Sequence, residues 1–120
     1  MRKIEVLGVW WSPPRGSFPI YGLALRLRQL SDAEAFRARD AEVVSVYLGD
    51  ADVSYGHAVF LLKDDGGVLI LLGDREDWEA IKHETEERSK KRGVEYREAL
   101  IELVEKVAEK GSGYVDLDEL

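Results

Sequence analysis

Residues 53–72 read Val-Ser-Tyr-Gly-His-Ala-Val-Phe-Leu-Leu-Lys-Asp-Asp-Gly-Gly-Val-Leu-Ile-Leu-Leu, two apolar runs joined by an acidic, glycine-rich tetrapeptide. Asp65-Gly66 between apolar runs predicts a β-hairpin, because glycine accepts the positive φ that a tight turn requires. The second run, 68–72, shows no polar alternation, so we expect a central strand that is covered on both faces. This hairpin places an antiparallel sheet at the centre of the predicted fold.

Strands and a loop are predicted on the N-terminal side of this hairpin. Residues 3–11 and 43–48 are rich in β-branched and aromatic side chains, which favours strands. Residues 12–19 hold three prolines and a glycine and are therefore expected to form a loop.

Two further segments lie between these strands. Residues 20–28 alternate leucine with alanine or arginine, which favours a half-buried strand. The alternative is a helix whose apolar stripe holds Ile20, Leu23, Leu27 and Leu30. Ser31 and Glu34 match a capping box, in which hydroxyl and carboxylate satisfy free amides, and this predicts a short helix over 32–41.

The C-terminal half has helical character. Asp74, with Asp77 three residues later, predicts the start of a helix. Residues 82–92 contain no large apolar side chain, so they suit either a solvated helix or a linker. Gly93 interrupts this run, and 94–110 has the broad apolar face of a packed helix.

Together these elements predict an α+β fold: an antiparallel sheet of about four to five strands, packed with one short and two longer helices. The long helix is expected at the C-terminal end. We expect residues 1–113 to form a single domain, followed by an acidic tail over 114–120.

Composition limits the class of protein. The 120 residues suit one domain, and 45% hydrophobic residues can close a modest core. No long apolar run or leader pattern is seen, so we expect no membrane span and a cytoplasmic location. Cysteine is absent, which excludes disulfides and a thiol nucleophile. The chain also lacks asparagine and is 34% charged, as is typical of a hyperthermophile protein.

Charge is distributed unevenly along the chain. Residues 1–39 hold seven Lys or Arg against three Asp or Glu, whereas 40–120 hold ten against 21, so the segments carry +4 and −11. Arginines among flat aromatic rings suit a surface for single-stranded nucleic acid, because cations contact phosphates and rings stack on bases. The candidate binding residues are Trp10, Trp11, Arg15, Phe18, Tyr21, Arg26, Arg28, Arg37 and Arg39.

A purely structural explanation competes with this interpretation. Neighbouring tryptophans in a strand point to opposite faces, so at least one of Trp10 and Trp11 is expected in the core. The arginines can equally pair with the acidic helices, and such surface pairs are common.

Other candidate chemistry is sparse. A group of aspartates suits a divalent cation for phosphodiester hydrolysis, although a turn or cap already accounts for each member. These aspartates are Asp50, Asp52, Asp64, Asp65, Asp74 and Asp77. His57 could act as a general base beside Asp52 or Tyr55, but a lone strand histidine is more often packed or hydrogen-bonded. The usual catalytic signatures are missing, so we expect no enzymatic activity, no cofactor and no metal.

In outline the chain resembles the ThermoDBP-related proteins of archaea, which bind single-stranded nucleic acid. The likeness lies in the thermophile composition, the α+β order, the aromatic–basic segment from Trp10 to Arg28 followed by Ser31–Arg39, and the helix over 94–110. The resemblance implies a cleft for a few unpaired nucleotides, without a cofactor, in a dimer or larger homo-oligomer.

We therefore expect a module that binds single-stranded nucleic acid, DNA ahead of RNA, with low sequence preference. The alternative is a protein–protein adaptor that docks through the helix 94–110 and the acidic tail 114–120. A metal-dependent nuclease built on the aspartates is the third hypothesis.

Overall fold

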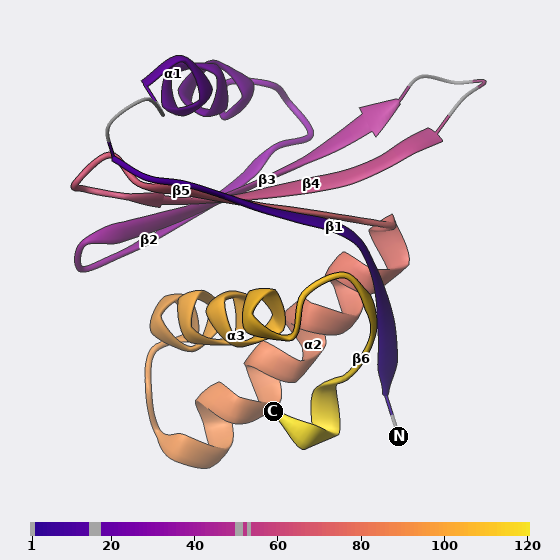
Figure 1. Ribbon diagram of the computed structural model, residues 1–120. Coiled ribbons are helices and arrows are strands. Elements are labelled where there is room, and N and C mark those ends of the chain that lie inside the picture. The colour runs from indigo at the N-terminus through magenta and orange to yellow at the C-terminus, as the bar shows by residue number, and fades with distance from the viewer. Residues whose placement is uncertain (1, 15–17, 50–51, 53) are drawn as a thin grey trace.

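The computed structural model describes residues 2–14, 18–49, 52 and 54–120. Within these residues the chain forms six strands, three helices and a final 3-10 turn (Figure 1). In chain order they are β1 (Lys3–Ser12), α1 (Phe18–Leu27), β2 (Glu34–Ala38), β3 (Ala41–Gly49), β4 (Ser54–Lys63), β5 (Val68–Gly73), α2 (Arg75–Arg92), α3 (Tyr96–Lys110), β6 (Gly113–Asp116) and the turn Leu117–Glu119.

The strands form one antiparallel sheet in the order β2-β3-β4-β5-β1-β6. The predicted hairpin is confirmed, because β4 and β5 pair along their length up to Leu62 opposite Val68. β5 lies inside the sheet, and Val68 and Leu69 are fully buried on opposite faces. The α+β class is as predicted, but the sheet has six strands among the described residues rather than four or five.

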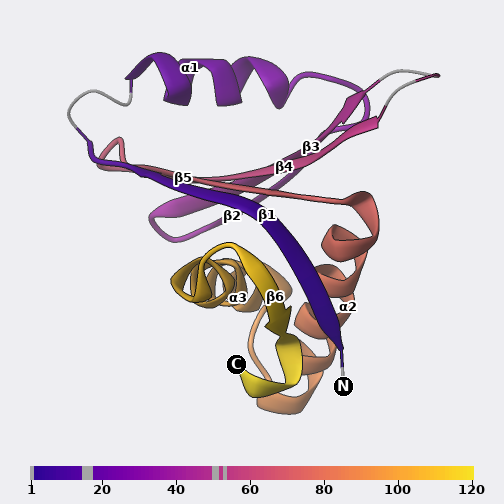
Figure 2. The same ribbon diagram turned by 45° about the vertical axis from the view of Figure 1, so that its right-hand side comes forward.

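Helices cover the two faces of the sheet unequally (Figures 1 and 2). We call the face under α2 and α3 the two-helix face, and the face under α1 the one-helix face. The larger core, on the two-helix face, includes Leu61, Leu69, Trp78, Leu100 and Leu103. The smaller core, on the one-helix face, includes Ala24, Val44, Val46, Phe60 and Leu62. The ten-residue α1 is thus the only helix among the described residues on the one-helix face.

Local capping signals correctly located α2. The Asp77 carboxylate accepts hydrogen bonds from the backbone N–H of Asp74, at 3.2 Å, and of Glu5, at 3.1 Å. At the other end Gly93 adopts φ 67° and its N–H bonds back to the carbonyl of Ser89. Residues 82–92 belong to this continuous helix, so the linker alternative is wrong.

Residues 20–28 are helical over most of their length, so the predicted strand is wrong. Pro19 occupies the first turn of α1, where a missing backbone N–H costs nothing. Ala24 is completely buried against the sheet, and Ile20 and Leu27, one turn away on either side, pack beside it. The segment buries this helical stripe against the sheet instead of adding a strand.

The predicted helix over 32–41 is also wrong. Residues Glu34–Ala38 form β2, which pairs along its whole length with β3. The Glu34 carboxylate accepts hydrogen bonds from Trp78 Nε1 at 3.2 Å and Lys82 Nζ at 2.9 Å instead of capping a helix. A sheet ladder and two partners distant in sequence outweigh the local capping signal.

The last helix is not at the C-terminal end, because β6 and the 3-10 turn follow α3. β6 pairs with residues 3–6 of β1. Val115 and Leu117 are buried in the larger core, and the Leu117 carbonyl accepts a hydrogen bond from Arg88 Nη2 at 3.1 Å. Residues 114–120, which we expected to be an acidic tail, are thus packed onto the rest of the fold.

Candidate interaction surface

A β-bulge divides β1 into two parts. Val6 lies opposite Gly73 and Gly8 lies opposite Leu72, so Leu7 is an extra residue in this strand. A bulge bends its strand and changes which side chains reach each face. The first part of β1 pairs with β6, and the second part pairs with β5 alone.

After the bulge, the side chains of β1 alternate between the two faces. Val9 packs against the larger core, and Trp11 lies opposite Leu69 of that core, so both belong to the two-helix face. Trp10 lies opposite Ile70, which packs in the smaller core, so Trp10 belongs to the one-helix face. The expectation that the adjacent indoles point to opposite faces is confirmed.

Both indoles are nevertheless at the surface. Trp10 is 52% exposed and Trp11 is 57% exposed, whereas Trp78 is 2% exposed. The expectation that Trp10 or Trp11 would be in the core is therefore wrong. The Trp10 ring lies over Gly8, where a Cβ atom would come within 2.3 Å of Trp10 Cη2. A larger residue at this position would therefore require the Trp10 indole to move.

The outer edge of β1 has no neighbouring strand beyond Val6. β6 reaches only residues 3–6, and no hydrogen bond from a described residue joins the outer edge of Leu7–Ser12. In Figure 1 this part of β1 runs along the front of the sheet, with β5 behind it and no strand drawn on its near side. We call Leu7–Ser12 the free edge.

The free edge differs from the edge strand at the other side of the sheet. β2 is short and carries Glu34 and Arg37, and charge is a common protection against unwanted pairing. The free edge is Leu-Gly-Val-Trp-Trp-Ser and holds no charged residue. Its only limits along the chain are the bulge at Leu7 and the pair Pro13-Pro14.

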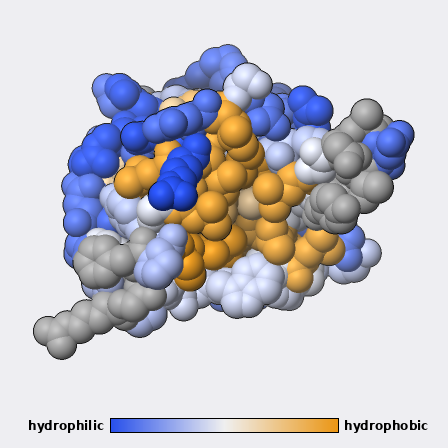
Figure 3. Space-filling view, turned by 90° about the horizontal axis from the view of Figure 1, so that it is seen from above, coloured by the Kyte–Doolittle hydropathy of each residue, from blue (hydrophilic) through white to orange (hydrophobic). Residues whose placement is uncertain are grey.

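Apolar side chains are also exposed on the one-helix face. Leu23, on the outer side of α1, is 51% exposed, and Leu30, just after that helix, is 49% exposed. Figure 3 looks onto this face and shows hydrophobic side chains gathered in its middle, with hydrophilic ones along its margins. Trp10 lies on the same side of the sheet.

Carboxylates engage most of the arginines that were predicted to bind phosphate. Arg28 binds Glu42 at 2.8 and 2.9 Å, Arg37 binds Asp64 at 2.8 and 2.9 Å, and Arg39 binds Glu98 at 3.0 Å. The Arg26 guanidinium, by contrast, has no hydrogen-bond or ion-pair partner among the described residues. Arg28 and Arg37 lie close together on the one-helix face, because Arg37 is directly opposite Glu42 in the sheet and Arg28 binds the same carboxylate. Arg39 instead reaches Glu98 of α3 on the two-helix face.

The remaining predicted residues are described only in part. Arg15 lies outside the described residues, and of Phe18 only its place at the start of α1 is described. Tyr21 is half-buried beside the smaller core. The predicted residues on the one-helix side of the sheet are thus Trp10, Tyr21, Arg26, Arg28 and Arg37. Trp11 and Arg39 lie on the two-helix side.

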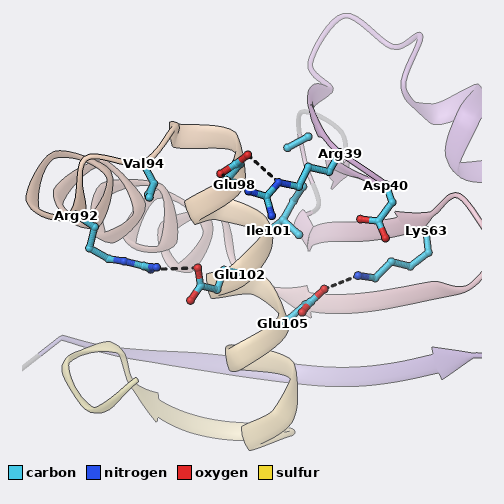
Figure 4. Close-up of a pocket in the computed structure, with 10 residues that line it drawn as sticks. Arg39, Asp40, Lys63, Arg92, Val94, Glu98, Ile101, Glu102 and Glu105 are labelled. Atoms are coloured by element: carbon cyan, nitrogen blue, oxygen red, sulfur yellow. Dashed lines mark hydrogen bonds and ion pairs between the residues drawn. The ribbon is translucent and has the colours of Figure 1, made fainter.

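A charged cleft lies between α3 and the turn that joins β2 to β3 (Figure 4). Its ion pairs are Arg39–Glu98 at 3.0 Å, Lys63–Glu105 at 2.6 Å and Arg92–Glu102 at 3.1 Å. Asp40 also lines the cleft and has no ion-pair partner among the described residues. Each cation here is neutralised and one carboxylate is left over, so the cleft disfavours a phosphate group.

A polar cluster lies inside the larger core, where His57 is packed and hydrogen-bonded as the structural alternative expected, with partners that the sequence did not indicate. The Ser45 hydroxyl and His57 Nε2 share a hydrogen bond, and the His57 ring stacks on Trp78 with centroids 5.8 Å apart. His57 Nδ1 is buried without a hydrogen-bond partner among the described residues. Burial lowers the pKa of His57 below its ordinary value of 6.5. Polar residues at strand positions that face the core were the sequence signal that could have predicted this cluster.

This cluster continues to α2 through Glu34. Burial opposes ionisation of Glu34, but hydrogen bonds from Lys82 and Trp78 outweigh it and lower the pKa of this carboxyl below 4.5. Ser45 is fully buried and His57 is 5% exposed, so their hydrogen bond is enclosed in the core. The general-base hypothesis placed His57 beside Asp52 or Tyr55, whereas His57 bonds to Ser45 and stacks on Trp78, and the Tyr55 side chain lies outside what the structure describes.

Neither a metal cluster nor a membrane-spanning helix is found in the described part of the chain. No three His, Asp or Glu side chains there lie together in a way that could hold a metal ion, and Asp50 lies outside it. No helix there is long and apolar enough to cross a bilayer. Comparison with known proteins finds no matching family model, no matching curated protein and no matching solved structure.

Proposed function

We propose that this protein is a binding module that pairs an extended polypeptide segment with its free edge. The observation that supports this proposal is an uncharged edge strand, Leu7–Ser12, with an exposed indole on each face. The unpaired backbone groups of such an edge bond best to another extended backbone, and side chains on both faces add selectivity. Tryptophan is enriched at binding hot spots because it offers a large apolar area with one polar group.

The proposal keeps the protein–protein class that the sequence suggested but changes the docking surface. The helix 94–110 and the tail 114–120 were the expected docking elements. α3 buries Leu100, Leu103 and Val104 in the larger core, and Val115 and Leu117 are buried with them. Their apolar side chains are therefore committed to the fold, whereas those of the free edge are exposed.

Selection of peptides from a phage-displayed library of random linear decapeptides tests the proposal. We expect the protein, tethered at low density, to retain peptides of alternating apolar character. Replacing both indoles in Trp10→Lys/Trp11→Lys should weaken their binding by at least about tenfold, or about 1.4 kcal/mol. Leu23→Lys/Leu30→Lys is the matched control, since these leucines have similar exposure but lie away from the edge. Equal binding to both double variants, or no retained peptide, would contradict the proposal.

Single-stranded nucleic-acid binding remains a second candidate function. Two observations favour it: both indoles are free to stack, and the Arg26 guanidinium has no partner among the described residues. Base stacking on an indole contributes about 1–3 kcal/mol and tolerates any sequence. A site of this kind on the one-helix side would use Trp10 and Arg26, with DNA the expected ligand ahead of RNA.

Titration of tryptophan emission with oligo-thymidine at low and high salt tests this second candidate. Quenching should weaken as salt rises, because phosphate contacts release counterions. Trp10→Ala and Arg26→Glu should each reduce it. Arg37→Glu should matter less, since Arg37 is already bound to Asp64. Emission that does not respond to the oligonucleotide at either salt concentration would exclude this function.

A further inference from the structure

We infer that the strand which pairs with the free edge is the free edge of a second copy of this chain, so that the two sheets join in a symmetric dimer. This inference rests on the proposed function and names its partner. It concerns the backbone of residues 8–12, which lie between the bulge at Leu7 and Pro13. Proline has no N–H to donate and ends such a ladder.

The charge of the segment favours a second copy. The chain carries −7, so most of its surface repels another copy of itself. The free edge is the exception, because it holds no charged residue and can face itself without like-charge repulsion. β2, at the opposite edge, carries Glu34 and Arg37, and such charged side chains oppose pairing with another strand.

The side chains are also self-complementary in an antiparallel register. A two-fold axis through Trp10 places Trp10 opposite Trp10 of the second copy, and Val9 opposite the second Trp11. The faces agree, because Val9 and Trp11 both lie on the two-helix face and Trp10 lies on the other. Aromatic–aromatic and aromatic–β-branched pairs are among the favourable cross-strand neighbours.

The same register closes the assembly. An isologous contact uses the same surface on both copies, so the free edges are consumed and no further chain can add there. Residues 8–12 span about 16 Å at 3.3 Å per residue, and the exposed indoles extend the contact on both faces. Each copy thereby covers the part of β1 that β6 leaves uncovered.

Sedimentation analysis of the whole chain tests whether the dimer exists. We expect a species of twice the 13.6 kDa mass that dissociates on dilution. Trp10→Lys places two ammonium groups opposite each other and should raise the dissociation constant by at least about a hundredfold. Leu23→Lys has matched exposure on the same side of the sheet and should remain dimeric. A wild-type monomer at all concentrations, or a dimer that Trp10→Lys leaves intact, would overturn the inference.

Cysteine cross-linking tests the register, since the natural chain has no cysteine. Trp10→Cys should form a disulfide-linked dimer rapidly under mild oxidation, because directly opposite residues lie within disulfide reach. Trp11→Cys is the matched control: its two copies are diagonal neighbours about 7–8 Å apart, beyond that reach. Rapid cross-linking of Trp11→Cys instead of Trp10→Cys would overturn the register.

The outcomes separate this inference from the proposed function. A monomeric protein whose edge still retains displayed peptides would overturn the second copy as the partner and leave the peptide-binding function standing. A protein that neither associates nor retains peptides would overturn both. A dimer that dissociates in Trp10→Lys, together with selective cross-linking at position 10, supports the second copy as the partner, and peptide retention by the same edge supports the proposed function.

Discussion

His57 is the residue whose ionisation should govern stability between neutral and mildly acidic pH. It is buried beside Ser45 and Trp78, and burial lowers its pKa below the ordinary 6.5. The unfolded chain therefore binds a proton more readily than the folded chain. Stability is fully present above about pH 6.5 and is lost as the pH falls from there through the folded pKa.

We predict that the urea midpoint of unfolding is lower at pH 5.5 than at pH 7.5, with an unchanged m-value. His57→Gln should flatten this dependence, whatever its effect on absolute stability. His83→Gln should preserve it, because the His83 side chain is 63% exposed. Glu34 acts in a different range: its pKa lies below 4.5, so its contribution is lost only at lower pH. Equal midpoints at pH 5.5 and 7.5 in the natural protein would contradict the prediction.

The residue scale also shows why most of the predicted phosphate-binding arginines are already paired. The partners Glu42, Asp64 and Glu98 could not be identified from the sequence, because they are 14 to 59 residues away from the arginines they bind. An arginine in a bidentate ion pair has fewer free donors for a phosphate. Arg26 retains its donors because no described carboxylate reaches it.

At the scale of elements, the C-terminal segment shows most clearly how contacts with distant residues decide local structure. Val115 and Leu117 are two apolar residues in an otherwise acidic stretch, which sequence analysis treated as a tail. Pairing of β6 with β1 directs both side chains into the larger core. The N–H of Leu117 also bonds to the carbonyl of Arg2 at 2.8 Å.

We predict that Leu117→Ala lowers the free energy of unfolding by about 2–5 kcal/mol, because a fully buried leucine leaves a cavity when truncated. Tyr114→Ala, which changes a residue 77% exposed in the same strand, should cost within about 0.5 kcal/mol. Chemical denaturation of both variants measures the difference. A Leu117→Ala protein as stable as the natural one would show that the segment is a loose tail after all.

At the scale of the whole molecule, one sheet joins two cores of unequal size. β3, β4 and β5 contribute side chains to both the larger and the smaller core, so neither core can open while the sheet stays intact. The chain should therefore unfold in a single transition.

Coincident transitions by two probes would verify this prediction. In Trp10→Phe/Trp11→Phe, Trp78 is the sole indole and its emission reports the larger core. Far-ultraviolet circular dichroism reports all helices and strands. We expect both signals to change at the same denaturant concentration. Loss of ellipticity before Trp78 becomes exposed would mean that the one-helix face unfolds separately.

Sequence alone determined the features whose partners are close along the chain. The hairpin turn at Asp65-Gly66, the start of α2 at Asp74 and its end at Gly93 each depend on neighbouring residues, so local chemistry was sufficient. The sequence also identified β5 as a central strand from its unbroken apolar run.

Only the tertiary structure decided the features that depend on distant partners. Ala24 packs on the sheet and makes 20–27 a helix, Glu34 finds Trp78 and Lys82 in place of a cap, and residues 113–116 become a strand beside β1. The extra residue at Leu7 decides which indole lies on which face, and the short reach of β6 leaves their edge open. Local patterns could not reveal these outcomes, because burial and pairing are free energies of contact between segments that the sequence keeps far apart.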